Sequence, residues 1–369
     1  MAYGTVNADV IGTSVANSNL GAGNATRFKN RLINGDQRID QRNAGASGTG
    51  TNNFVTDRWK YVASQASKGT WGQNLGSVTP PVGYTNYLGF SSSSAYSVAS
   101  GDYFLFEQRI EGLNIADLAW GTASAKTVTL SFQVYSSLTG TFGGYIQNSG
   151  STRSYPFTYT ISSASTWTQI SVTIPGDTTG TWLTTNGIGI EVGFSLGTGS
   201  TYVGTANTWA ATQYNAPSGA INIVGTNAAT WYVTAIQLEV GSSATGFDYR
   251  DYTTELSLCS RYYQSTYNIG ISAGSASNAS AIARTLDATQ PYPTLAWCMP
   301  TVMRTTPTTT YYSPVSGASG KACTSPGNAD VAAGVWSFDG MRNVTLIING
   351  ISVSQSYGLF AHFTCSAEL

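Results

Sequence analysis

Apolar and polar residues alternate with a period of two along much of the first two thirds of this chain. The clearest case runs from Val128 to Tyr135, and the same alternation recurs at Phe104–Ile110, Ile170–Ile174 and Ile188–Phe194. This period places one row of side chains in a core and the other toward water, as in antiparallel sheets. Turn-forming clusters of Gly, Ser and Pro separate the alternating segments, and helical periodicity is nearly absent, apart from a single turn expected at Asn114–Trp120. The pattern predicts an all-β fold that begins with a jelly-roll β-sandwich.

One short helix is predicted after this sandwich. Asp251 is a residue type that caps helix N-termini. Tyr252, Leu256, Cys259 and Tyr263 follow it at spacings of four, three and four, which places them on one helical face. Because so short a helix is marginal alone in water, this face must pack against something. The sandwich, the C-terminal domain and another subunit remain open as partners, and we take these four residues as candidate oligomer contacts.

The chain returns to β-type segments after about residue 266. Alternating or apolar runs occur at Thr308–Tyr312, Val335–Phe338, Val344–Ile348 and Leu359–Cys365. Asn349-Gly350 is the strongest short hairpin signal in the chain. His362, the only histidine, lies opposite the apolar row of the last run, where a surface or interface position is expected. We predict a second, smaller antiparallel β-sandwich of about 100 residues.

These observations divide the chain into four parts. Residues 1–27 hold too few apolar side chains for a core, and a disordered tail or an arm that docks on a neighbour fits them equally well. The predicted parts are an N-terminal attachment arm (1–27), a jelly-roll domain (28–250), a linker helix (251–265) and a C-terminal β-sandwich (266–369).

Charge is scarce in this sequence. Only 9% of the 369 residues are charged, against roughly 25% in an ordinary soluble domain, and the net charge is −1. Nucleic acid is therefore not expected as a partner, because phosphate binding needs clustered Lys and Arg. We expect neither a signal peptide nor a membrane-inserted segment, since the first residues lack a basic start and no run of 18 apolar residues occurs.

Cysteine usage points to buried free thiols. Cys259, Cys298, Cys323 and Cys365 all lie in the last third and form no CxxC pair. With a single histidine, a Cys₂His₂ zinc site is excluded. Free thiols are the expectation for assembly in a reducing cytosol, and a disulfide within the C-terminal domain is the alternative.

Three segments of the chain resemble, in order, blocks of bacteriophage tail-fibre and related virion structural proteins. The first is NRLINGDQRIDQRNAGA with TDRWKY (Asn30–Tyr61), the second is QLEVGSSATGFDYRDYTTELSLCSRYYQ (Gln237–Gln264), and the third is the closing FTCSAEL. The resemblance implies a non-enzymatic fibre subunit of a virion, assembled in the host cytoplasm. It implies a homotrimer that attaches to other virion proteins through its N-terminal arm. Within the first block, Asp57-Arg58-Trp59 is interpreted as a core anchor beside an ion pair.

The two ends of the first domain also resemble the ends of jelly-roll carbohydrate-binding modules. The segments are LINGDQRIDQ (residues 32–41) and WYVTAIQLEV (residues 231–240). In several such modules an acid near each end helps to hold a structural calcium, and the matching residues here are Asp36 and Glu239. The alternative is that Asp36 caps a turn and Glu239 pairs with an arginine. No other cofactor is expected.

A host-surface glycan is the expected partner. Sugar rings present apolar C–H faces that stack on aromatic rings, and this chain contains 22 Tyr and 9 Trp. The candidates in loop-like context are Trp209, Tyr214, Tyr311, Tyr312 and Trp336. A place in a local core or at a subunit interface is the alternative for each of them.

The function expected from the sequence is non-enzymatic adhesion of a fibre subunit to a host glycan. One alternative is a purely structural capsid-decoration or tail subunit. The other is a polysaccharide depolymerase, which needs two carboxylates facing one cleft about 5–10 Å apart. Its candidate acids are Glu107, Glu111, Asp177, Glu191, Asp287 and Asp339. No fixed-period repeat or nucleophile motif accompanies them.

Overall fold

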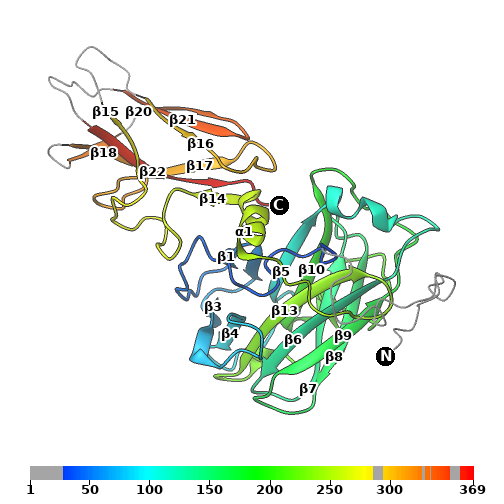
Figure 1. Cartoon of the computed structure of the whole chain (residues 1–369). Helices are drawn as coiled ribbons and strands as arrows, with labels where there is room; N and C mark the ends of the chain where they lie inside the picture. Colours follow the sequence, from blue (N-terminus) through cyan, green and yellow to red (C-terminus); the bar gives the residue numbers. More distant parts are fainter. Residues whose placement is uncertain (1–27, 286–293, 326–328, 333, 350–357) are drawn as a thin grey trace, which may run out of the picture.

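The computed structural model describes residues 28–285, 294–325, 329–332, 334–349 and 358–369 (Figure 1). The N-terminal arm (1–27) therefore lies outside the described residues. The fold is all-β: a jelly-roll sandwich is followed by one α-helix, α1 (Tyr252–Ser260), and by a smaller unit of antiparallel strands. Figure 1 shows α1 and the C-terminal end of the chain lying together between the two units.

The first β-domain consists of two antiparallel sheets with the orders β1-β2-β5-β10-β7-β8 and β3-β4-β13-β6-β9. The bounds of the six-stranded sheet are β1 Asn53–Thr56, β2 Trp59–Ala63, β5 Tyr103–Glu111, β10 Ile188–Thr198, β7 Gly140–Gln147 and β8 Ser154–Ile161. Those of the five-stranded sheet are β3 Gly69–Gln73, β4 Leu88–Ser92, β13 Thr230–Val240, β6 Val128–Ser136 and β9 Thr168–Ile174. The four alternating segments are thus strands, as predicted. The expected turn at 114–120 is two short 3₁₀ helices, Gly112–Asn114 and Ala116–Leu118.

Aromatic rings from both sheets meet in the core of the first domain. Phe132 of β6 contacts Phe194 of β10 with ring centroids 5.0 Å apart, and both side chains are fully buried. Trp59, which follows the buried pair Asp57 and Arg58, is also fully buried and donates its indole N–H to the carbonyl of Asn34. The interpretation of Trp59 as a core anchor is confirmed. Burial of this kind stabilises by about 2–3 kcal/mol per large side chain.

The outer face of the six-stranded sheet is less exposed than the alternation predicts. On β10, the side chains of Glu191 and Ser195 point away from the core of the sandwich, yet both are buried. One reason is that two short parallel strands, β11 (Val203–Gly204) and β12 (Ala216–Pro217), return over this face. Pro217 packs so closely on Gly143 that a Cβ atom at that glycine would overlap it. Period-two alternation predicts on which face of the strand each side chain lies, but it cannot predict whether a later loop covers that face.

The second β-domain contains two sheets. Its larger sheet is built around β22 (Gly358–Ser366), which pairs with β14 (Tyr263–Ser265), β15 (Ile282–Thr285), β17 (Thr308–Tyr312) and β18 (Lys321–Ser325), while β19 (Ala329–Ala332) pairs with β18. Its smaller sheet has the order β16-β21-β20, from β16 (Thr294–Cys298), β21 (Asn343–Asn349) and β20 (Gly334–Asp339). Leu359, Ala361, Phe363 and Cys365 are all buried in its core, as the last strand predicts.

One boundary differs from the sequence analysis. Tyr263 does not lie on the helix: α1 ends at Ser260, and Tyr263 begins β14, which pairs with Ser366. The strand β21 lies between β16 and β20, so both of its edges are occupied over Val344–Ile347. The hairpin expected across Asn349-Gly350 extends into residues 350–357, which lie outside the described residues.

His362 is fully buried, so the expected surface or interface position is wrong. Its Nδ1 lies 2.9 Å from the Thr266 hydroxyl and its Nε2 lies 2.8 Å from the carbonyl oxygen of Ser277. Its ring stacks on Tyr267 at 3.8 Å. The last strand thus uses this side chain to hold the segment that follows β14.

The four cysteines are free thiols, as expected. Three are buried, but Cys298 is exposed, so the expectation of burial fails for that residue. No helix among the described residues is long and apolar enough to cross a bilayer.

Candidate functional site: the domain junction

Three segments singled out in the sequence, Asn30–Tyr61, Gln237–Gln264 and the closing FTCSAEL, come together at one place, which we call the domain junction. It lies between the two β-domains and includes Arg58, Glu111, Tyr262 and Glu368. Arg58, only 3% exposed, forms an ion pair with Glu368 and donates a hydrogen bond to the carbonyl of Arg109. Its guanidinium also lies 3.6 Å from the ring centroid of Tyr262. One side chain of the first block thus contacts the second and third blocks.

A second buried carboxylate ties α1 to the six-stranded sheet. Glu111, at the end of β5, accepts hydrogen bonds from Arg261 at 2.6 and 2.8 Å and from the Tyr262 hydroxyl at 2.9 Å. Burial acts to raise the pKa of Glu111, but these charge-assisted hydrogen bonds outweigh it and hold the pKa below its usual value. The carboxylate therefore stays ionised and the contact between α1 and β5 persists over the neutral range.

Helix α1 packs its apolar face within its own chain. Cys259 and Tyr262 form a small buried cluster with Ile33 and Ile39, and Leu256 and Leu369 pack against it. Asp251 caps the helix by accepting a hydrogen bond from the Thr254 N–H at 2.9 Å, as predicted. Because the helix is capped and covered by residues 33–39, it needs no neighbouring chain in order to form.

The four candidate oligomer contacts therefore have different environments in the structure. Cys259 and Tyr263 are buried inside the monomer, and the expectation that they contact another subunit is wrong for both. Leu256 is half-buried against the Ile33–Ile39 cluster. Tyr252 remains 40% exposed and is free to contact another molecule.

Arg304 is a junction residue that the sequence analysis missed. It lies between β16 and β17, and its guanidinium donates to the carbonyls of Ala367 at 2.8 Å, Glu368 at 2.9 Å and Asn186 at 2.8 Å. Asn186 belongs to the first β-domain, so Arg304 bridges both domains directly. No local pattern marks this position, since a single arginine in a loop carries no periodicity.

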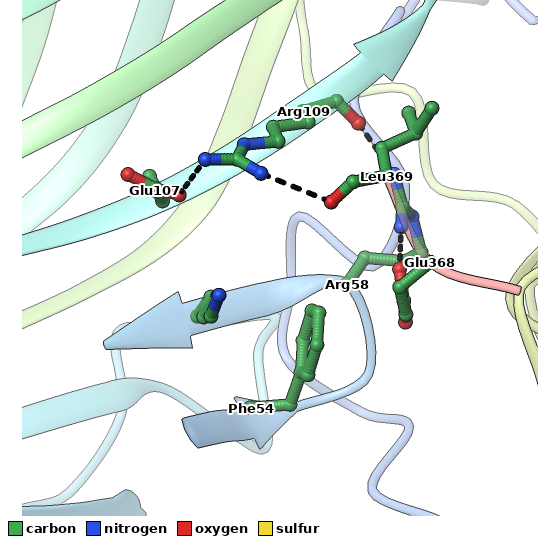
Figure 2. Close-up of a pocket in the computed structure, with 7 residues that line it drawn as sticks. Phe54, Arg58, Glu107, Arg109, Glu368 and Leu369 are labelled. Atoms are coloured by element: carbon green, nitrogen blue, oxygen red, sulfur yellow. Dashed lines mark hydrogen bonds and ion pairs between the residues drawn. The ribbon is translucent and has the colours of Figure 1, made fainter. Parts of the chain in front are cut away.

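A cluster of buried charged groups continues from the junction across the outer face of the six-stranded sheet. Arg109 contacts Glu107 at 3.1 Å and donates to the carbonyl of Leu369 at 3.1 Å (Figure 2). It also contacts Glu191 at 2.9 Å. The Tyr145 hydroxyl donates to Glu191 at 2.8 Å and lies 3.2 Å from Glu107. Burial, and then the neighbouring carboxylate of Glu191, raise the pKa of Glu107 to about 8.

The pocket beside this cluster is too small for a sugar ring. Phe54, Arg58, Lys60, Glu107, Arg109, Glu368 and Leu369 line it (Figure 2), and its volume of about 10 Å³ is room for a single water molecule. Of the acids considered for a depolymerase, the structure brings together Glu107 and Glu191. Both are buried, at 3% and 5% exposure, and the pocket that Glu107 lines has room for only a water molecule. Glu111 and Asp177 are each bound by an arginine, Asp339 lies in the second β-domain, and Asp287 lies outside the described residues.

The two acids considered for calcium have protein partners. Asp36 forms an ion pair with Arg38. Glu239 accepts hydrogen bonds from the backbone N–H and hydroxyl of Thr245 at 2.8 and 2.7 Å and from Gln237, so the expected arginine partner is wrong. Among the described residues, no group of three His, Cys, Asp or Glu side chains is placed to hold a metal ion.

We expect EDTA to leave the thermal stability of the protein unchanged, because both carboxylates are satisfied without a cation. Differential scanning calorimetry before and after dialysis against EDTA measures this directly. A fall in Tm of several degrees that added Ca²⁺ restores and Mg²⁺ does not would instead establish the calcium that the resemblance implies.

The candidate glycan-binding aromatics do not form one site. Trp209 is half-buried among Trp120, Trp182 and Tyr155, with centroid distances of 5.1–5.6 Å, and its indole N–H donates to the carbonyl of Pro175. It is thus part of a local core, which was the alternative. Tyr214 packs on Gly204. Tyr311 and Tyr312 lie on β17 of the other domain, where Tyr311 packs on the core and Tyr312 contacts Tyr267. The backbone of Trp336 belongs to β20, and its side chain lies outside the described residues.

No protein-family model matches the chain, and no curated protein matches it. The solved structures that it resembles include the enzymatically active domain of tailspike protein 4 of bacteriophage CBA120, with 9% identity, a TM-score of 0.32, and coverage of 58% of this chain. The chain spans only 22% of that tailspike structure. Another is a family 11 carbohydrate-binding module from Clostridium thermocellum in complex with a beta-1,3-1,4-mixed-linked tetrasaccharide, with 12% identity and a TM-score of 0.27; the match covers 54% of this chain and 98% of that one. A third is TmCBM61 in complex with beta-1,4-galactotriose, with 8% identity and a TM-score of 0.30; the match covers 57% of this chain and 99% of that one. These similarities are weak.

Proposed function

We propose that this protein is a subunit of a bacteriophage virion fibre that attaches, without catalysis, to a glycan on the host surface. It would assemble in the host cytoplasm as a homotrimer and join other virion proteins through residues 1–27. The observation that carries the proposal is the domain junction. The three segments that resemble phage virion proteins all contribute side chains to the contact between the two β-domains, through Arg58, Tyr262 and Glu368.

The junction suits a protein that must transmit force between its parts. Breaking a buried ion pair by removing one partner costs about 3–5 kcal/mol, because the other charge is left buried and unpaired. Arg58–Glu368 is such a pair, and it joins segments that are far apart in the sequence. Arg261–Glu111 also joins distant segments, but only its carboxylate is buried. A fibre subunit needs such a joint, because a distal domain on a loose linker could not hold the particle against a surface.

The adhesive part of the proposal is supported by the neutral character of the chain. With 9% charged residues, the surface must consist largely of hydroxyl, amide and aromatic groups. Such groups match the hydroxyls and the apolar faces of a neutral sugar. Linking several weak sites in one particle raises the overall avidity without new contacts.

We expect the isolated full chain to have a solution mass of about three times its 38.8 kDa monomer mass. Multi-angle light scattering on a sizing column measures this mass without a shape assumption. A monomer at micromolar concentration would contradict a self-assembling trimer, and the subunits would then have to be organised by the particle.

A glycan array probed with the labelled full chain tests adhesion. Binding to a defined set of glycans supports the proposal, whereas binding to none would favour a purely structural virion subunit. Release of reducing sugar from a bound polysaccharide would contradict the non-catalytic mechanism. In that case Glu107→Gln and Glu191→Gln would show whether the buried pair is responsible.

A further inference from the structure

Three aromatic rings that the sequence analysis did not propose as glycan-binding residues form a connected row on two loops of the first β-domain. Tyr84 contacts Phe247 edge-to-face with centroids 5.6 Å apart, and Phe247 contacts Tyr249 edge-to-face at 6.5 Å. The guanidinium of Arg38 lies 4.4 Å from the centroid of the Tyr249 ring. We call Tyr84, Phe247, Tyr249 and Arg38 the aromatic ladder. Edge-to-face pairs and a stacked arginine each fix the orientation of a ring.

The backbone around Tyr249 is anchored so that this ring faces outward. On one side, the N–H of Asp248 donates to Gln237 at 2.7 Å, and on the other Arg250 donates to the carbonyls of Asn30 and Leu32. The side chains of both neighbours are buried, whereas Tyr249 is 51% exposed. A ring held outward between two buried, hydrogen-bonded residues is pre-organised, because binding to it would cost little ordering entropy.

Further apolar side chains are exposed close to these residues in the sequence: Val82, two residues before Tyr84, is fully exposed, and Tyr252, three residues after Tyr249, is 40% exposed. Within the ladder Tyr249 is the exposed ring, and the half-buried rings of Phe247 and Tyr84 continue it. A single exposed apolar residue is ordinary, but an exposed ring continued by two partly exposed rings marks a candidate interaction site. Aromatic residues and arginine are also the residue types that contribute most to binding energy.

Charge complementarity limits the kind of ligand that fits. Arg38 is already paired with Asp36, and Arg250 contacts Asp248 at 3.5 Å and Glu255 at 3.3 Å. Arg38 of the ladder and its neighbour Arg250 are therefore both compensated, and they offer no excess charge to an anionic sugar. Next to Tyr84, the exposed hydroxyl of Thr85 donates to the amide oxygen of Asn86 at 2.8 Å, which leaves polar groups at the edge of the row.

We infer that the aromatic ladder binds a neutral oligosaccharide, with an apolar sugar face stacked on Tyr249 and sugar hydroxyls bonded near Thr85 and Asn86. This inference rests on the proposed function, since it names the place where the fibre would hold its glycan. The ladder is built from the first and second resembling segments together with the loop that contains Tyr84.

The test is an array that carries neutral gluco-, manno- and galacto-oligosaccharides beside anionic oligogalacturonate. It is probed with the full-length wild type and with the Tyr249→Ala, Tyr249→Phe and Tyr202→Ala variants. Tyr202 is the matched control, because it is a half-buried tyrosine in an edge-to-face pair with Tyr103 on a different loop. We expect Tyr249→Ala to weaken binding to the neutral glycans by about tenfold or more, while Tyr249→Phe and Tyr202→Ala stay close to wild type.

Each other outcome separates this inference from the proposed function. If the wild type binds and Tyr249→Ala binds equally well, the site is wrong while adhesion stands. Binding to oligogalacturonate alone would overturn the neutral class of ligand. If the wild type binds none of these probes or any other glycan, both the inference and the adhesive function fail. If Tyr249→Ala lowers the solution mass and leaves glycan affinity unchanged, the ladder is a subunit contact, and the inference is overturned.

Discussion

Arg58→Ala is expected to lower the free energy of unfolding by about 3–5 kcal/mol, more than any surface substitution in this chain. The replacement removes the guanidinium between Glu368, the carbonyl of Arg109 and the ring of Tyr262. Glu368 would keep only its contact with Arg42 at 2.9 Å, in a place where it is largely shielded from water. For a protein of this size we expect a drop in Tm of about 5 °C, measured by circular dichroism. Loss of the junction should also separate the unfolding of the two β-domains into two transitions.

Arg31→Ala is the matched control for this experiment. Arg31 belongs to the same sequence block and makes a bidentate contact with Asp117 at 2.6 and 2.8 Å, but that pair is exposed. Exposed pairs of this kind contribute about 0–1 kcal/mol. If Arg58→Ala were no more damaging than Arg31→Ala, the junction would not hold the domains together. The double variant Arg58→Ala with Glu368→Ala should be less destabilised than the sum of the single variants, because it leaves no unpaired charge from that ion pair.

The parts of this fold that sequence could predict are those with a local signal. The strands β5, β6, β9 and β10 follow from alternation, and α1 follows from Asp251 and its apolar spacing. The end of α1 was not predictable in this way. Tyr263 continues the helical spacing, but pairing with β22 overrides it, and that pairing joins residues about 100 positions apart. Secondary structure that depends on a distant strand leaves no local trace.

The junction shows the same limit for a functional site. The sequence marked the three segments but gave no indication that they meet, because Arg58 and Glu368 are 310 positions apart. In the sequence, the segment around Arg58 was interpreted as a core anchor and the segment around Glu368 as part of the closing strand. Arg304 was missed altogether, and so was the ladder at Tyr249. In each case the function of the residue comes from the segment packed against it, and not from its neighbours in the chain.

Glu107 is expected to make the protein less stable as pH rises from about 5 to about 8. Burial and the nearby Glu191 raise the pKa of Glu107 to about 8 in the folded protein, above its ordinary value of 4.5 in an unfolded chain. Between these values the folded state keeps a proton that the unfolded state has lost, so stability falls with rising pH. The stabilising contribution is complete below pH 4.5 and is lost as pH rises through about 8. One pKa unit corresponds to 1.36 kcal/mol, so the change amounts to about 3 kcal/mol across this range.

Glu107→Gln should remove this dependence, because glutamine is neutral at every pH and keeps the shape of the protonated carboxyl. The measurement is the difference in unfolding free energy between variant and wild type, from urea titrations at pH 5, 6, 7 and 8. Between pH 5 and pH 8, the unfolding free energy of the variant should rise by about 3 kcal/mol relative to that of the wild type. Taking the difference cancels the opposite contribution of His362, whose pKa burial lowers. A difference that stays constant with pH would mean that Arg109, Lys60 and Tyr145 stabilise an ionised Glu107. The cluster beside the junction would then hold a full pair of negative charges.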